Sequence, residues 1–159
     1  MKHIWSPWRI KYFQEHAPGC VLCNVQKDTD GPGNLVVARG RQCYVLLNRY
    51  PYTSGHLMVI PFAHKPYLEH LDPQTRAEMM ELVTRCMTVL RKVYNPQAFN
   101  IGANIGEAAG AGIKEHVHIH IVPRWAGDTN FMSAVGETRV LPESLEQTWQ
   151  RVQNGFSEG

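Results

Sequence analysis

The sequence predicts an α+β fold in which an antiparallel sheet of about five strands carries one long helix, with a second helix near the C-terminus. Three observations lead to this fold class: short apolar runs bounded by turn residues, one long stretch with apolar residues at helical spacing, and short connections between neighbouring runs. Short connections favour antiparallel pairing, because parallel strands need a longer crossover. A chain of 159 residues is expected to form a single domain, residues 1–159.

The first three strands are expected at Leu35–Ala38, Cys43–Leu47 and His56–Phe62, which are apolar runs flanked by turn residues. The stretch NRYPYTSG joins the second and third runs and indicates a hairpin. Before them, NVQKDTDGPGN at 24–34 is polar and punctuated by Gly and Pro, which predicts a loop. We therefore divide the domain into an N-terminal arm (1–33), a core (34–132) and a C-terminal extension (133–159).

The long helix is expected to begin after Asp72, a suitable N-cap, with Pro73 at its first position, and to end before Pro96. A strand over Phe99–Ile105 and a second helix over Pro142–Gln153 follow. Apolar residues of the long helix recur at helical spacing, so that one stripe faces the core. The residues of this stripe are Met79, Leu82, Val83, Cys86, Val89, Leu90 and Val93.

Composition argues against several classes of protein. Sixteen Lys and Arg against fourteen Asp and Glu give a net charge of +2 without a basic cluster, so we expect no stable nucleic-acid partner. Neither a signal-peptide-like run nor a transmembrane span occurs, so we expect no membrane partner and a cytoplasmic location. Four irregularly spaced cysteines are too few for a disulfide framework, and they favour a reducing compartment.

The stretch EHVHIHIVPRW carries three histidines at every second position, namely His116, His118 and His120. In a β-strand these side chains share one face, and the apolar residues between them share the other. The apolar face can pack into a core while the histidines line a cleft. Pro123 is expected to stop the ladder, because it has no N–H to donate.

Two mechanisms fit a strand of histidines. One imidazole could attack phosphorus while its neighbours donate hydrogen bonds to the phosphate oxygens. Alternatively, all three could bind a catalytic zinc ion that activates water. Further polar groups come from Asn48 and His56, and the glycine-rich 106–112 stretch offers bare backbone at Gly110 and Gly112. The residues alone leave both mechanisms open.

HVHIHIV at 116–122 resembles the defining motif of the histidine triad (HIT) family, His-φ-His-φ-His-φ-φ with φ apolar. LLNRYPYTSGHLMVIP at 46–61 and VPRWAGDTNFM at 122–132 are similar to segments of the dinucleoside polyphosphate branch of that family. IWSPWR and the GCVLC stretch at 19–23 resemble its microbial members, which include diadenosine tetraphosphate phosphorylases. The resemblance covers about Ile4 to Met132. It implies a HIT-like fold that works as a homodimer.

The resemblance also implies roles for single residues. His118 would attack the α-phosphorus of a nucleotide substrate and form a nucleotidyl-histidine, while the main-chain carbonyl of His116 holds the far nitrogen of His118. His120 would bind phosphate oxygens. Asn48 would bind the ribose, and His56 and Asn104 would lie near the phosphates. Gly110 and Gly112 complete the phosphate-binding candidates because of their bare backbone.

The nucleotidyl group would pass to water in a hydrolase, or to inorganic phosphate in a phosphorylase. Phosphorylase-type members often carry a hydroxyl residue just before the triad, where this chain has Gly112 and Ile113. Both acceptors therefore stay open. Nucleoside phosphoramidates are an alternative substrate class, because they also present an α-phosphorus with a leaving group.

Cys20 and Cys23 have the spacing of half a zinc site, although a redox pair or two unrelated thiols would give the same pattern. The resemblance extends to bacterial members of the family and to galactose-1-phosphate uridylyltransferases. It implies a Cys₂His₂ set completed by His64 and His116. A closed set of four ligands predicts structural zinc, and no organic cofactor is expected.

Overall fold

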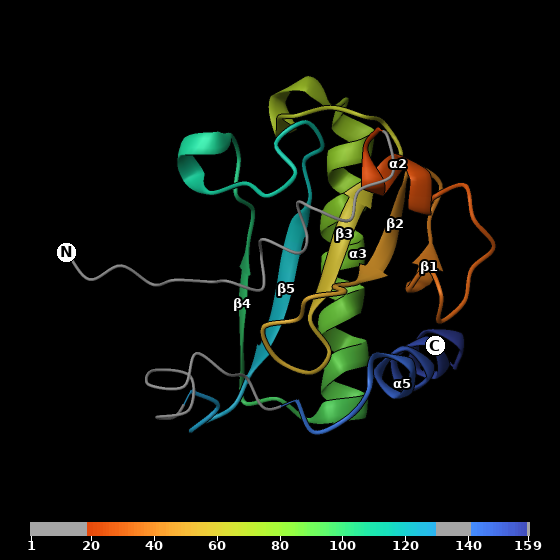
Figure 1. The fold of residues 1–159 in the computed structure, drawn as a ribbon, viewed down its shortest axis with the longest axis vertical. Coiled ribbons are helices and arrows are strands. Elements are labelled where there is room, and N and C mark those ends of the chain that lie inside the picture. The colour runs from red at the N-terminus through yellow and green to blue at the C-terminus, as the bar shows by residue number, and fades with distance from the viewer. Residues whose placement is uncertain (1–18, 130–140, 159) are drawn as a thin grey trace.

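The computed structural model describes residues 19–129 and 141–158, and its centre is a five-stranded antiparallel sheet (Figure 1). The strand order is β1-β2-β3-β5-β4, so β5 is an inner strand and β4 lies at an edge. This arrangement confirms the predicted fold class. The strands are β1 (Val36–Arg39), β2 (Cys43–Leu47), β3 (Leu57–Pro61), β4 (Ala98–Gly102) and β5 (Ile119–Arg124).

Helix α3 (Pro73–Tyr94) runs along one face of the sheet and contacts β2, β3 and β5 (Figure 1). The Asp72 side chain accepts a hydrogen bond from the backbone N–H of Thr75, as expected of an N-cap. Asn95 ends the helix in the left-handed conformation. The predicted apolar stripe is confirmed, because six of its seven residues are buried and Val93 is half-buried.

Helix α5 (Leu145–Ser157) packs against α3 and β1. It begins after Ser144 rather than at Pro142, because Ser144 and Gln147 form a reciprocal capping box. It also continues past the predicted end at Gln153. Gly155 lies within the helix and does not interrupt it. A Cβ at this position would lie 2.8 Å from Val89 Cγ1 of α3. The close approach of the two helices therefore needs a residue without a side chain.

A short helix, α2 (Val21–Val25), lies where the sequence analysis expected the start of a loop. Leu22 is buried, and its carbonyl accepts a hydrogen bond from the Tyr44 hydroxyl at 2.8 Å. Cys43, the neighbour of Tyr44 on β2, points the opposite way and contacts the carbonyl of Thr75 in α3. Helix α2 therefore packs on the sheet face opposite α3 and brings the two N-terminal cysteines to the sheet.

Two expectations about the histidine stretch are wrong. Regular pairing of β5 begins at Ile119, so His116 and His118 precede the strand, although the backbone N–H of Val117 still bonds to the carbonyl of Lys65 at 2.8 Å. Pro123 does not stop the strand, which continues to Arg124. Its pairing with β3 has ended by then and only β4 remains beside it. The Pro123 carbonyl accepts from Thr53 Oγ1 at 2.8 Å and so points away from β4. The N–H and C=O of a strand residue point to the same side, so the N–H that Pro123 lacks costs no hydrogen bond to β4.

The remaining connections include two 3₁₀ turns, η1 (Leu68–His70) and η2 (Glu107–Ala109). The expected hairpin between β2 and β3 is present, and β4 pairs with β5 as expected but ends at Gly102 rather than Ile105. None of the helices within 19–129 and 141–158 has the length and apolar character to cross a membrane. IWSPWR and the last residues of VPRWAGDTNFM lie outside the described residues, and the three-part division of the domain stays a prediction.

Candidate functional site

The three histidines lie just before β5 (His116 and His118) and at its start (His120), and they differ in exposure. His116 and His118 are 0% and 6% exposed, whereas His120 is half-buried. The expected alternation is confirmed on the apolar side, because the intervening residues Val117, Ile119 and Ile121 are buried. His120 pairs across the sheet with Met58 of β3 and with Gly102 of β4.

His118 has a tautomer fixed by the main chain. Its Nδ1 lies 2.8 Å from the carbonyl oxygen of His116, the bond that the sequence analysis expected. A carbonyl only accepts, so Nδ1 carries the proton and Nε2 keeps its lone pair. Burial lowers the pKa of His118, and the bond to the carbonyl opposes this to a smaller extent. The ring is therefore neutral near pH 7, which is the state of a nucleophile.

His56 and His120 form a second pair of rings beside His118. His56 Nε2 lies 2.9 Å from His120 Nδ1, and the backbone N–H of Tyr52 lies 3.1 Å from His56 Nδ1. The His118 and His120 rings meet edge to face with centroids 4.8 Å apart. The Asn48 side-chain amide lies 3.4 Å from His56 Nδ1. Four of the predicted site residues are thus brought together.

Tyr52 was missed by the sequence analysis. Its ring lies against His56 and His120, with centroid distances of 4.7 and 6.4 Å, while its main-chain N–H reaches His56. The carbonyl of Pro61, which bonds to His116 Nε2 at 2.8 Å, was missed as well. A main-chain partner leaves no signal in the residue type, so only the fold could identify these contacts.

The connection between β4 and β5 carries the remaining phosphate-binding candidates. Asn104, Gly110 and Gly112 are all exposed there, on either side of η2. Gly110 has a φ of 80°, a conformation that glycine adopts without strain. The phosphate-binding roles of these three residues stay predictions.

The predicted metal ligands converge. One ligand atom from each of Cys20, Cys23, His64 and His116 lies within 4.8 Å of the others. The Sγ–Nδ1 distances are 3.4 Å for Cys20 to His116, 3.5 Å for Cys23 to His116 and 3.2 Å for Cys23 to His64. Tetrahedral zinc with bonds of about 2.3 Å to sulfur and about 2.0 Å to nitrogen places S and N ligands about 3.5 Å apart. The residues present therefore fit a zinc ion.

His116 is oriented for this role by its other nitrogen. Nε2 donates to the carbonyl of Pro61 at 2.8 Å, so the lone pair lies on Nδ1 and faces the two sulfurs. Burial lowers the pKa of His116, which keeps the ring neutral. The pKa of Cys23 is raised by its burial and by the neighbouring Cys20. A bound cation would reverse that shift by stabilising the thiolates.

The geometry distinguishes between the two mechanisms. The group of convergent metal-ligating atoms found within the described residues contains His116 but neither His118 nor His120. The Nδ1 of His118 is already bonded to a carbonyl and the Nδ1 of His120 faces His56. The structure therefore favours phosphorus chemistry at His118 over a zinc ion held by all three histidines.

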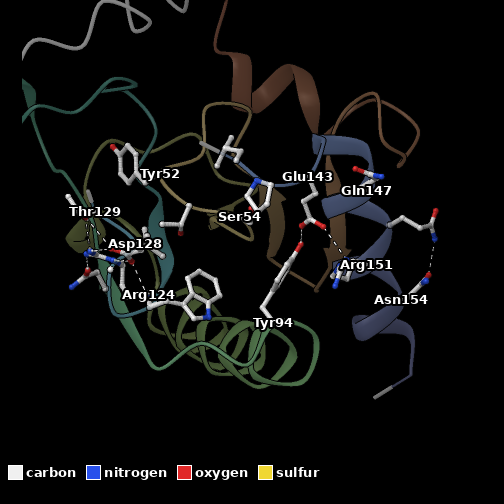
Figure 2. A pocket seen from close by; sticks show the side chains of 18 residues that line it. Tyr52, Ser54, Tyr94, Arg124, Asp128, Thr129, Glu143, Gln147, Arg151 and Asn154 are labelled. Carbon is white, nitrogen blue, oxygen red and sulfur yellow. Dashed lines mark hydrogen bonds and ion pairs between the residues drawn. The ribbon is translucent and has the colours of Figure 1, made fainter. Parts of the chain in front are cut away.

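A cavity of about 1340 Å³ opens beyond Tyr52, near the end of β5 (Figure 2). Its walls come from the end of α3, the residues after β5 and one side of α5, and Figure 2 shows Arg151 directed at Glu143 on the α5 side. The Glu143 carboxylate accepts from the Tyr94 hydroxyl and pairs with Arg151 at 3.3 Å. These charged side chains bind one another, and the predicted site residues do not line this cavity.

Comparison with known proteins gives a consistent result. The sequence profile of the HIT domain matches residues 32–127. An AP-4-A phosphorylase of Mycobacterium tuberculosis is 37% identical over 158 residues, covering 93% of this chain and 80% of the relative. An asymmetrical bis(5'-nucleosyl)-tetraphosphatase of Schizosaccharomyces pombe is 34% identical over 96 residues, covering 60% of this chain and 52% of the relative.

Solved structures agree with the sequence matches. A zinc-bound histidine triad family protein from Mycobacterium smegmatis superposes with a TM-score of 0.70 at 27% identity. The superposition covers 88% of this chain and 94% of that protein. Sequence profile, relatives and fold agree with the histidine motif at the start of β5. The chain therefore belongs to the HIT family.

Proposed function

We propose that this protein cleaves dinucleoside polyphosphates, such as diadenosine tetraphosphate, through a nucleotidyl intermediate on His118. The observation that carries the proposal is the bond between His118 Nδ1 and the carbonyl of His116, which leaves the lone pair on Nε2. The named activities of the relatives from M. tuberculosis and S. pombe support the substrate class. A neutral, buried imidazole with a fixed tautomer is suited to attack on phosphorus.

In the first step, Nε2 of His118 forms a bond to the α-phosphorus, and the bond from phosphorus to the bridging oxygen breaks. The electron pair of that bond leaves with the second nucleotide. The ring then carries positive charge, which the carbonyl of His116 stabilises through the Nδ1 proton. His120 is proposed to hold the phosphate oxygens, together with Asn104, Gly110 and Gly112, and Asn48 to bind the ribose.

In the second step, an acceptor oxygen attacks the same phosphorus and the bond to Nε2 breaks. Water as acceptor yields a nucleoside monophosphate and a proton, whereas inorganic phosphate yields a nucleoside diphosphate. The 37% identical relative bears the name of a phosphorylase, and the relative from S. pombe that of a tetraphosphatase. Either acceptor is consistent with an intermediate on His118.

We further propose that Cys20, Cys23, His64 and His116 hold structural zinc. When bound, the ion would link the start of α2, the segment after β3 and the segment before β5. Their convergence within 4.8 Å and the zinc-bound relative support this assignment. His116 would then serve both regions, with its ring in the metal cluster and its carbonyl on His118. A full set of four protein ligands gives the ion no open position for catalysis.

A homodimer and a cytoplasmic location complete the proposal. β4 lies at the edge of the sheet, and Ile101 on it is 43% exposed, which supports association through this side. The cysteines of the described residues are unbridged thiols, which supports a reducing compartment. Sedimentation of the full chain tests the dimer, and Ile101→Lys is expected to shift it towards the monomer.

The experiment that tests the activity is incubation with diadenosine tetraphosphate, with and without inorganic phosphate, followed by identification of the products. AMP and ATP without phosphate would identify a hydrolase. ADP and ATP only in the presence of phosphate would identify a phosphorylase. Absence of both product pairs would overturn the substrate assignment, and nucleoside phosphoramidates would be tested next.

A further inference from the structure

We infer that His56 is a positioning residue that sets the ring tautomer of His120. The main-chain N–H of Tyr52 holds His56, and His120 then donates a hydrogen bond from its Nε2–H to the phosphate. The catalytic part of this inference rests on the proposed function. The tautomer itself does not, because it is a property of the protein without substrate. The inference gives His56 a different role from the direct phosphate contact expected from the sequence.

The direction of each hydrogen bond in this group determines which ring nitrogen carries a proton. The backbone N–H of Tyr52 can only donate, so Nδ1 of His56 must accept and carries no proton. A neutral imidazole has one proton, and that of His56 therefore lies on Nε2. This proton faces Nδ1 of His120 at 2.9 Å, so Nδ1 of His120 accepts. The proton of His120 is thereby assigned to Nε2.

The turn that carries the Tyr52 amide is fixed to the sheet. Thr53 Oγ1 donates to the carbonyl of Pro123 at 2.8 Å, which ties the turn to β5. The backbone N–H of His56 bonds back to the carbonyl of Thr53 at 3.2 Å. The Tyr52 ring covers both imidazoles, with centroids 4.7 and 6.4 Å away. The Tyr52 N–H, the first donor in this series of hydrogen bonds, is thus held in place from two sides.

His56 is placed to act through His120 rather than on substrate. Its side chain is 0% exposed, and each of its ring nitrogens has a bonding partner on the protein. His120 is less buried and lies edge to face with His118. The neighbouring rings therefore have opposite polarity: His118 keeps a lone pair on Nε2 and His120 keeps a proton there. One is suited to attack and the other to stabilise the charge that develops on oxygen.

Nitrogen NMR of protein labelled in its histidines tests the tautomer directly, at a pH above the ordinary histidine pKa. His120 is expected to show an unprotonated Nδ1 and a protonated Nε2. In His56→Leu the donor is lost, and the His120 signals are expected to become those of a tautomer mixture. In His56→Gln the tautomer is expected to persist, because the amide can accept from Tyr52 and donate to His120. His70, an exposed residue of η1, provides the control variant His70→Leu.

Kinetics with diadenosine tetraphosphate separate positioning from simple packing. His56→Leu is expected to lower kcat about 100-fold with little change in KM, since a positioned donor acts mainly in the transition state. His56→Gln is expected to recover most of this loss, and His70→Leu to behave like the parent. A loss of equal size in both His56 variants would overturn the inference.

A protonated Nδ1 on His120 in the parent protein would also overturn the inference, even if His56→Leu does not fold. So would a His120 tautomer that is unchanged in a folded His56→Leu variant. Conversely, the expected tautomers in a parent protein that cleaves no dinucleotide would uphold the tautomer assignment and overturn the proposed function.

Discussion

His116 and His118 are two residues apart and both are buried. Each ring donates a hydrogen bond to a main-chain carbonyl, but the two rings use different nitrogens. His116 uses Nε2 and directs its Nδ1 lone pair at the two cysteines. His118 uses Nδ1 and keeps its lone pair on Nε2. The carbonyl partner, rather than the residue type, thus decides which histidine faces the proposed zinc ligands Cys20, Cys23 and His64 (the metal cluster) and which lies at the proposed site of phosphorus chemistry (the reaction centre).

The metal cluster and the reaction centre, which the segment 116–118 joins, should therefore respond differently to mutation. The metal cluster lies between segments that are distant in the sequence, so its loss should first affect stability. The reaction centre lies on a sheet that is already assembled, so its loss should first affect turnover. Four substitutions test this separation.

The largest effect is expected for His118→Asn. Without Nε2 no nucleotidyl intermediate forms, and turnover of diadenosine tetraphosphate should fall roughly 10⁴-fold or more. The zinc content should stay at the level of the parent, because His118 is not one of the converging ligands. Product analysis and metal analysis of the same preparation measure both quantities. Residual turnover within tenfold of the parent would remove His118 from the mechanism.

The second effect is expected for Cys23→Ser, which removes one metal ligand. Zinc at a free concentration 100-fold above its Kd stabilises the folded state by about 2.7 kcal/mol, and we expect this contribution to be lost. For a chain of this size the loss corresponds to a fall of about 5–10 °C in Tm. Turnover measured well below that temperature should fall less than tenfold, which activity assays and thermal unfolding can check.

Chelation of the parent protein is the matched control for Cys23→Ser. It should reproduce the fall in Tm, with loss of activity slower than loss of the metal. Immediate loss of turnover from chelated but folded protein would mean that the two regions are one catalytic metal site.

A smaller effect is expected for Thr53→Val, which keeps the shape of the side chain and removes the hydroxyl bonded to the Pro123 carbonyl. The hydrogen bond contributes about 1 kcal/mol. The turn that carries Tyr52 should loosen, and turnover should fall several-fold while the zinc content stays unchanged. Parallel measurements of kcat, KM and metal content check this. Altered zinc content would show that the turn also supports the metal cluster.

The smallest effect on turnover and zinc content is expected for Ser144→Ala, which removes the capping box of α5. The expected cost is about 1 kcal/mol, or about 2–4 °C in Tm, with neither turnover nor zinc content changed. Thermal unfolding measures the cost. A change in turnover would show that α5 contributes to the reaction centre.

Much of the fold could be predicted from local signals. Asp72 and Pro73 give the start of α3 because capping depends on residues adjacent in the sequence. The pairing of β2 with β3 and of β4 with β5 could be predicted from their short connections, whereas the pairing of β3 with β5, which has α3 and β4 between them in the chain, was not predicted. The end of α5 could not be predicted, because the close approach to α3, which requires a glycine at position 155, depends on tertiary packing. Nor could the continuation of β5 through Pro123, because it depends on where β3 begins: Leu57, the first residue of β3, pairs with Ile121, and β5 continues beyond it beside β4 alone.

The same division applies to the site. The convergence of Cys20, Cys23, His64 and His116 was predicted by resemblance, and the structure brings these four together. The tautomers could not be predicted, since they depend on main-chain atoms of Pro61 and Tyr52 that any residue could supply. The tautomer of each histidine thus depends on contacts that the motif does not contain.

The measurement that tests the central claim most directly is rapid quenching of the enzyme with labelled diadenosine tetraphosphate, followed by mapping of the labelled peptide. We expect one nucleotidyl group on Nε2 of His118, formed before product is released and absent from His118→Asn. Product formed without any protein-bound nucleotide, at quench times shorter than one turnover, would contradict it.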